Sequence, residues 1–92
     1  MTVKNLDTLN NNFDFNNLTK RGFYSAIIYQ NNCPKNSPIN DTVGMNIIVV
    51  ECDFPTYISQ LMMTTAAHFF RVYDIGTNNW TKWQKISLIE VD

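Results

Sequence analysis

The chain has 92 residues, of which 45% are hydrophobic, 13% aromatic and only 16% charged. This length suits a single domain, and the apolar content is typical of a folded chain rather than a disordered one. The formal charge is −1 and the seven lysines and arginines are scattered, so we expect no nucleic-acid partner, because such binding needs a basic stripe. No apolar run approaches the roughly 18 residues of a membrane span, so we expect no membrane insertion.

The N-terminal residues 1–18 are polar, with isolated apolar anchors. The spacing of Leu6, Leu9 and Phe13 fits a short helix, although asparagine-rich sequence favours helices poorly. The alternative is an extended arm whose anchors dock on another surface, and these anchors are Leu6, Leu9, Phe13 and Phe15. Both interpretations stay open at this point.

From Gly22 onward the chain reads as strands separated by short turns. The five runs are residues 23–29 (FYSAIIY), 45–52 (MNIIVVEC), 57–65 (YISQLMMTT), 68–75 (HFFRVYDI) and 80–91. This pattern predicts a small, mostly β domain with an antiparallel sheet. Residues 47–50 are apolar at every position, which predicts a strand covered on both faces and hints at an oligomer. Turn-forming residues predict a surface loop at 31–43 and turns at 53–57 and 76–79.

The residue patterns that usually carry catalysis or metal binding are missing from the sequence. His68 is the single histidine and lies beside two phenylalanines, so we expect it to be packed rather than to bind a ligand. Cys33 and Cys52 have no secretory context and are expected to be free thiols. The three glycines are isolated, which leaves no phosphate-cradling loop. We therefore expect no enzymatic activity, no metal and no cofactor.

Several short motifs follow one another in order along the chain. The first is a leucine and a threonine before a Gly-Phe-Tyr strand start (Leu18, Thr19, Gly22, Phe23 and Tyr24), and the second is a Tyr-x-x-Gln strand (Tyr57 and Gln60). An aromatic strand that carries Arg71 and a closing Trp-x-x-Trp (Trp80 and Trp83) follow them. In this order and spacing, residues 14–86 resemble the knob domain of phage tail fibres and R-type pyocin fibres. The chain departs from the family pattern at Arg21, where a proline is common.

The resemblance implies a homotrimeric virion protein, made in the host cytoplasm, that attaches to bacterial surface glycan. In this interpretation residues 1–18 are the docking or trimerising arm that contacts other virion proteins, and residues 19–92 form the knob-like β domain. The alternative is a small architectural virion protein, a head or tail decoration or adaptor, without receptor binding of its own. A monomeric cellular carbohydrate-binding module is disfavoured by the surplus of apolar strand faces.

The aromatic and polar residues within the strands allow more than one interpretation. We expect Trp80 and Trp83 to be structural anchors, both turned inward by a β-bulge; the alternatives are one exposed stacking face or a two-tryptophan sugar platform. Gly22 is expected to provide a special backbone angle where the strand starts. Gln60 and Arg71 are expected to join a structural network or to contact a ligand, with Arg71 paired to Asp74 or Glu51 or stacked on Tyr73 or Trp83. The candidate receptor contacts are Tyr57, Arg71, Tyr73 and Trp83, with residues of the loop and turns.

Overall fold

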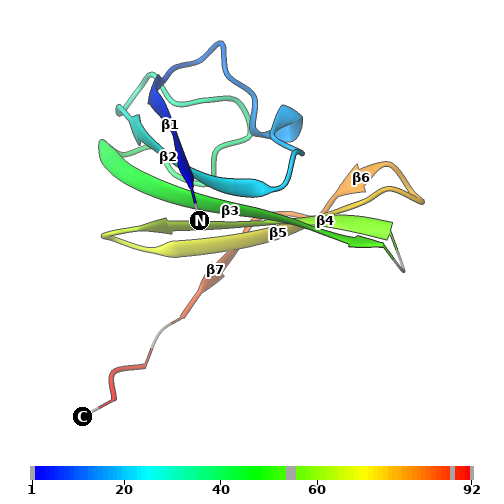
Figure 1. The fold of residues 1–92 in the computed structure, drawn as a ribbon. Coiled ribbons are helices and arrows are strands. Elements are labelled where there is room, and N and C mark those ends of the chain that lie inside the picture. The colour runs from blue at the N-terminus through cyan, green and yellow to red at the C-terminus, as the bar shows by residue number, and fades with distance from the viewer. Residues whose placement is uncertain (1, 54–55, 88, 92) are drawn as a thin grey trace.

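The computed structural model describes residues 2–53, 56–87 and 89–91, which form one seven-stranded sheet (Figure 1). The neighbouring strands run in the order β1-β2-β3-β4-β5-β6, and β7 also pairs with β5. Every pair is antiparallel except β1 with β2, which is parallel. The predicted mostly β, antiparallel-rich class is confirmed. The elements are β1 (Val3–Leu9), the 3-10 turn η1 (Phe15–Asn17), β2 (Gly22–Ile28), β3 (Val43–Asp53), β4 (Thr56–Thr64), β5 (His68–Asp74), β6 (Asn79–Trp80) and β7 (Gln84–Ile86).

The N-terminal segment is a strand, not the helix that the spacing of its apolar residues suggested. Val3–Leu9 pairs in parallel with β2, so it belongs to the sheet instead of projecting as an arm. A parallel pair needs a long crossover, and residues 10–21 provide it by passing over one face of the sheet. The four expected docking anchors lie in or against the domain's own core, with Phe15 and Leu9 buried and Leu6 and Phe13 partly buried.

One face of the sheet is covered by two long loops, residues 10–21 and 29–42 (Figure 1). The loops are joined to each other, because the Lys35 N–H donates to the Phe13 carbonyl (2.8 Å) and the Phe15 N–H donates to the Lys35 carbonyl (3.1 Å). The main hydrophobic core lies between these loops and the sheet. Its members are Leu9, Phe15, Leu18, Tyr24, Ala26, Ile28, Met45, Ile47, Val49, Ile58, Met62 and Phe69.

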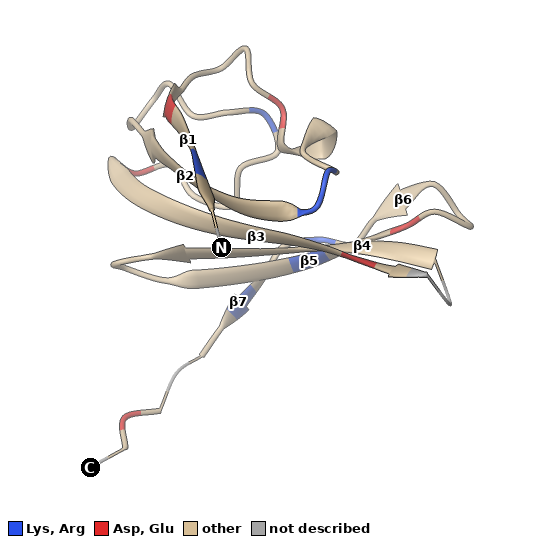
Figure 2. Ribbon diagram, in the orientation of Figure 1, with Lys and Arg blue, Asp and Glu red and all other residues tan. Residues whose placement is uncertain are grey.

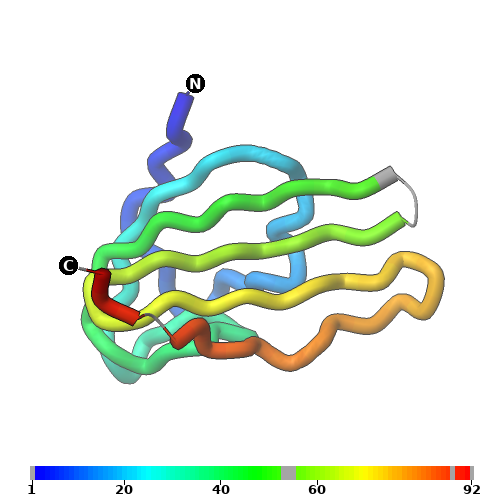
Figure 3. Tube along the Cα trace, turned by 90° about the horizontal axis from the view of Figure 1, so that it is seen from below, coloured from blue at the N-terminus to red at the C-terminus, as the bar shows by residue number. Residues whose placement is uncertain are grey.

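The opposite face carries no covering element among the described residues. Figure 3 views the molecule from this side, with β3, β4 and β5 in front of the loops. A row of apolar residues crosses five neighbouring strands, and Val50 in the next row is 50% exposed. The row consists of Val3, Phe23, Ile48, Leu61 and Phe70. We call this row, together with Ile27, Val50, Met63, Val72 and Ile86, the open face.

The expectation that residues 47–50 are covered on both sides is therefore wrong for the single chain. Ile47 and Val49 are buried under the loops, whereas Ile48 and Val50 alternate with them and point to the open face. The physical reason is the two-residue period of a strand, which sends successive side chains to opposite faces of the sheet. A strand with apolar residues on both faces still needs something to cover its second face.

The C-terminal part also differs from the single strand expected over residues 80–91. It consists of the short strands β6 and β7, both paired with β5, with residues 81–83 between them. After β7 the chain runs away from the sheet on the side of the open face (Figure 1), and Ile89 and Val91 are almost fully exposed. Leu88 lies outside the described residues, as do Phe54 and Pro55 of the turn predicted at 53–57.

The charged residues are dispersed over the fold (Figure 2). Lys20 and Arg21 precede β2, Arg71 lies on β5 and Lys85 on β7. In the part of the chain that the structure describes, no helix has the length and apolar character needed to cross a membrane.

Candidate functional site

Gln60 and Arg71 are two polar residues that lie opposite each other on β4 and β5, facing the loops. Gln60 is fully buried, and its Nε2 donates to the carbonyls of Phe15 and Leu18, both at 2.8 Å. Its Oε1 accepts a hydrogen bond from Arg71 Nε at 2.8 Å. One glutamine therefore joins the crossover loop to the arginine, and the amide is satisfied on both sides.

The guanidinium of Arg71 lies against two indole rings. Its Cζ lies 3.9 Å from the ring centroid of Trp80 and 4.5 Å from that of Trp83, and the residue is only 3% exposed. Both distances are within the range of cation–π attraction. Stacking on Trp83 is confirmed, but pairing with Asp74 or Glu51 is wrong: Asp74 is exposed, and its Oδ1 accepts instead from the Gly76 N–H.

Trp80 and Trp83 reach the same face because the strand register shifts between them. Trp80 of β6 pairs with Tyr73, and Gln84 of β7 pairs with Phe70. Three residues separate Trp80 from Gln84, whereas two residues separate Phe70 from Tyr73 on β5, so the β6–β7 segment contains one extra residue. Continuing the β7 register by one step places Trp83 opposite Arg71. This extra residue is a bulge of the kind that the sequence predicted, and it lies within residues 81–83.

Trp83 is anchored by its polar atom as well as by its ring. Its Nε1 donates to the carbonyl of Asn36 at 2.7 Å, and its ring meets Phe15 edge-on, with ring centroids 6.4 Å apart. Tyr73 packs against Trp80 with centroids 5.0 Å apart. The interpretation of both indoles as inward anchors agrees with these contacts, and each indole remains partly exposed.

An open pocket of about 400 Å³ lies beside this arginine and its two indoles. Two polar atoms of its lining residues, Arg71 Nη2 and Asn16 Oδ1, are buried without a hydrogen-bond partner. The lining contains two cations and no carboxylate, and it consists of Asn16, Asn36, Ser37, Arg71, Trp80, Thr81, Lys82 and Trp83. We call it the tryptophan pocket.

Burial and nearby charge act in opposite directions on Arg71. Burial lowers the pKa of Arg71 to about 10, and the carboxylate of Asp14 acts in the other direction. Stacking on two indoles further favours the charged form, so the guanidinium is a cation at neutral pH. Among the described residues, no carboxylate forms an ion pair with this buried cation.

Asp14 organises the rim of the tryptophan pocket. Its Oδ1 accepts from Asn36 Nδ2 and from the Asn16 N–H, both at 2.8 Å. These two bonds, that of Asn36 first, lower the pKa of the Asp14 carboxyl. Asn36 has a left-handed backbone, with φ of 60°, a conformation that asparagine adopts more readily than most residues. One carboxylate thus fixes two asparagines of the lining.

The Gly-Phe-Tyr start has a structural role. A Cβ at Gly22 would lie 3.2 Å from the ring of Tyr24, so the absence of a side chain lets this ring pack closely. The Tyr24 hydroxyl donates to the Lys20 carbonyl at 2.6 Å. Phe23 faces the other way and belongs to the open face.

Of the four expected receptor contacts, the structure brings three together. Arg71, Trp83 and Tyr73 lie on the loop-covered side, whereas Tyr57 is on the opposite face, one position before the buried Ile58. A hydrogen bond with Cys52 is the main cause that raises the pKa of the Tyr57 hydroxyl. The 31–43 loop, which was expected to supply contacts, contributes Asn36 and Ser37, whereas sequence reasoning missed Asn16, Thr81 and Lys82. No local signal identifies Asn16, because only the folding of its loop brings it to the tryptophans.

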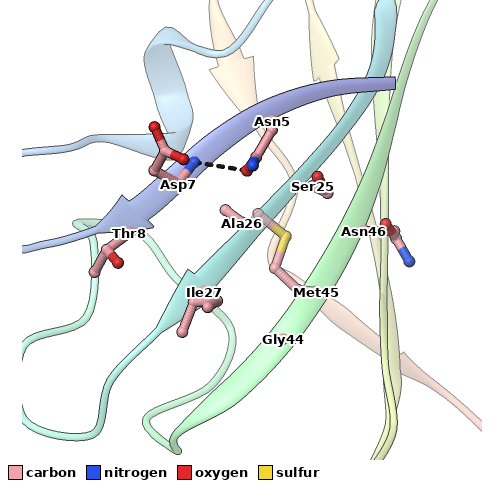
Figure 4. Close-up of a pocket in the computed structure, with 9 residues that line it drawn as sticks. All are labelled: Asn5, Asp7, Thr8, Ser25, Ala26, Ile27, Gly44, Met45 and Asn46. Carbon is pink, nitrogen blue, oxygen red and sulfur yellow. Dashed lines mark hydrogen bonds between the residues drawn. The ribbon is translucent and has the colours of Figure 1, made fainter. Parts of the chain in front are cut away.

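A second hollow, of about 410 Å³, lies over the ends of β1, β2 and β3 (Figure 4). It accompanies an irregularity in the pairing of β1 between Asn5 and Thr8, where Asp7 has a φ of 59°. The Asp7 N–H donates to Asn5 Oδ1 at 2.8 Å, which supports this conformation locally. None of its lining residues has a buried polar atom without a partner. The tryptophan pocket is therefore the stronger candidate site.

The cysteines and acidic groups among the described residues add no second site. Cys33 and Cys52 are not joined in a disulfide, which agrees with the prediction from the sequence. Within the described ranges, no three or more His, Cys, Asp or Glu residues come together as a metal site would require. No protein-family model, curated protein or solved structure matches this chain.

Proposed function

We propose that this chain is a structural protein of a phage virion, the knob domain of a homotrimeric fibre that attaches to bacterial surface glycan. The observation that carries the proposal is the open face: an apolar row across five strands on the side without a covering loop among the described residues. Val3 and Phe23 of this row are exposed, and the other three residues are partly buried. Soluble monomers rarely expose a contiguous apolar surface of this kind. Self-association removes it from water, and the resemblance to fibre knobs makes three the expected number of copies.

In this proposal the two faces of the sheet have different roles. The open face is the contact between copies, while the tryptophan pocket lies on the loop-covered side and stays accessible in the trimer. Three weak sites on one particle bind a repeating surface together, because the second and third contacts are effectively intramolecular. Indole rings beside hydrogen-bonding side chains suit sugars, which present both an apolar ring face and hydroxyl groups.

A second function, an architectural protein without receptor binding, is favoured by the Gln60 network. All three hydrogen bonds of Gln60 serve to hold the loop against the sheet. In that case Arg71 and its tryptophans are an internal clamp and the pocket is incidental. Attachment of the purified chain to bacterial cells or to isolated surface glycan separates the two functions, since only the adhesion protein binds.

The oligomeric state tests the open-face argument directly. We expect light scattering at low micromolar concentration to give about 32 kDa, the mass of three chains of 10.7 kDa. Val50→Lys places a charge on the open face and is expected to give a monomer. Its matched control is Glu51→Lys, at the adjacent and exposed residue on the other face, which is expected to remain a trimer.

Circular dichroism checks that both variants fold. A monomeric wild-type chain contradicts the proposed trimer. An unchanged mass for Val50→Lys contradicts the open face as the contact surface.

A further inference from the structure

The tryptophan pocket contains a buried cation whose hydrogen-bonding capacity is only partly used. The Arg71 Nε donates to Gln60 Oε1 and the Cζ lies against both indoles, so the Nη atoms at the edge of the guanidinium remain for other partners. Nη2 at this edge is buried and has no partner. A buried charged donor without an acceptor is costly, which makes the site receptive to an acceptor from outside.

The pocket's charge specifies the kind of acceptor. Arg71 and the exposed Lys82 are its only charged lining residues, and the Asp14 carboxylate at the rim is bonded to Asn36 and Asn16. The remaining lining is indole, hydroxyl and amide, which suits a ligand with hydroxyl groups and an apolar ring face. A guanidinium edge matches a carboxylate in shape and charge, and bonds between charged groups are about twice as strong as neutral ones.

We propose that the tryptophan pocket binds the carboxylate of an acidic sugar residue, with Arg71 Nη2 as the buried donor and Lys82 as the outer cation. The proposal rests on the glycan-attachment function above and names the ligand class of that site. Asn16, Asn36, Ser37 and Thr81 are placed to contact the sugar hydroxyls.

Access to Nη2 requires a small movement, because this atom lies below the pocket surface. The Asn16 side chain is suited to move, since its Oδ1 has no hydrogen bond to lose. The backbone of Asn16 stays in place, because its N–H is bonded to Asp14. After such a movement Asn16 Oδ1 can accept from a sugar hydroxyl, which would satisfy both unpartnered atoms in the complex.

The chain's own fluorescence provides the assay. Trp80 and Trp83 are its only tryptophans and both line the pocket, so a bound ligand changes the emission directly. We would titrate the full chain with oligosaccharides of galacturonic, glucuronic and sialic acid, each beside its methyl ester. Esterification removes the charge but keeps the sugar ring, so at least one acid should bind about tenfold or more tightly than its ester. Added salt should weaken that binding.

Variants locate the binding in the pocket. Lys82→Gln should lower the affinity for the acidic ligand by about twofold to fivefold, as expected for the loss of an exposed charge. Lys85→Gln, a lysine three residues later that does not line the pocket, should leave affinity unchanged. Arg71→Lys keeps the charge but loses the planar edge, and should reduce affinity by about tenfold or more. If Arg71→Lys does not fold, the Lys82 and Lys85 pair still decides the question.

Three results would overturn the inference: no saturable fluorescence change with any acid, equal binding of acid and ester, or a sugar phosphate that competes better than every carboxylate. These failures differ from failure of the proposed function. A trimer that attaches to cells but shows no preference for acids refutes the ligand class alone, whereas a monomer that attaches to nothing refutes the fibre-knob function.

Discussion

Gln60 offers the sharpest test of how this domain is held together. Gln60→Met keeps the length of the side chain but removes all three hydrogen bonds. The carbonyls of Phe15 and Leu18 then lose their donor, and Arg71 Nε loses its acceptor, in a place where Gln60 has no exposed surface. Methionine fills similar space, so the cost comes from these stranded polar groups and not from a cavity.

The magnitude follows from the number of stranded groups. Each buried polar group left without a partner costs about 1–3 kcal/mol, and a charged one costs more. Three such groups therefore remove roughly 3–6 kcal/mol of the free energy of unfolding, once local rearrangement is allowed for. Small domains have about 5–15 kcal/mol in total, so we expect Gln60→Met to be close to the limit of folding.

Urea unfolding followed by tryptophan fluorescence measures this loss at one fixed protein concentration, which keeps any contribution from association equal. The matched control is Gln30→Met, the same change at an exposed loop position, where we expect a difference within about 0.5 kcal/mol. A loss below about 1 kcal/mol for Gln60→Met would refute the reasoning. It would mean that water or rearranged side chains satisfy the three groups as well as the glutamine does.

Two further predictions concern the backbone and the pocket rim. Gly22→Ala should destabilise the domain by about 1–2 kcal/mol, because Gly22 has a φ of 158°, the special backbone angle expected at this strand start, and the new Cβ would lie 3.2 Å from the Tyr24 ring. Gly44→Ala meets nothing within 4 Å and should be neutral or stabilising. Thermal unfolding of the pair checks this, and equal effects would contradict it. Glycine at position 36 can adopt the left-handed backbone of Asn36, so Asn36→Gly removes only the side-chain hydrogen bond to Asp14. This bond is the main cause of the lowered Asp14 pKa, so NMR of the carboxyl should find the pKa closer to its ordinary value. A carboxyl whose pKa is lowered in the folded state contributes stability that is lost as the pH falls through that pKa. The variant should therefore lose less stability than wild type on acidification. An unchanged Asp14 pKa in the variant would exclude the Asn36 hydrogen bond as the cause of the lowered pKa.

Local pattern was sufficient for the central strands. Alternation and turn residues predicted runs that overlap β2, β3, β4 and β5, because a half-buried strand repeats every two residues and its turns are short. The two polar residues in these strands, Gln60 and Arg71, were also recognised as members of a network or a ligand site. Their side-chain types alone identified them, because buried polar groups need partners.

The partners themselves could not be predicted. Gln60 bonds to main-chain carbonyls 45 and 42 residues earlier in the chain, and carbonyls carry no sequence signal. The N-terminal strand was missed for a related reason: its polar sequence follows no strand pattern, and its pairing with β2 depends on a crossover that only the complete fold specifies. Residues 81–83 form a bulge that was predicted, although its position within the strand was not.

The sequence by itself determined the class of the fold and the residues that matter within it, because strand periodicity, turn chemistry and the rarity of polar groups in apolar strands are local properties. Tertiary structure alone decided which face of the sheet the loops cover, and so which apolar residues remain on the open face. It also decided that an asparagine-rich loop meets Arg71 and two tryptophans around one pocket. Both outcomes depend on contacts between distant segments, where packing and hydrogen bonding select one arrangement among many that the local pattern allows.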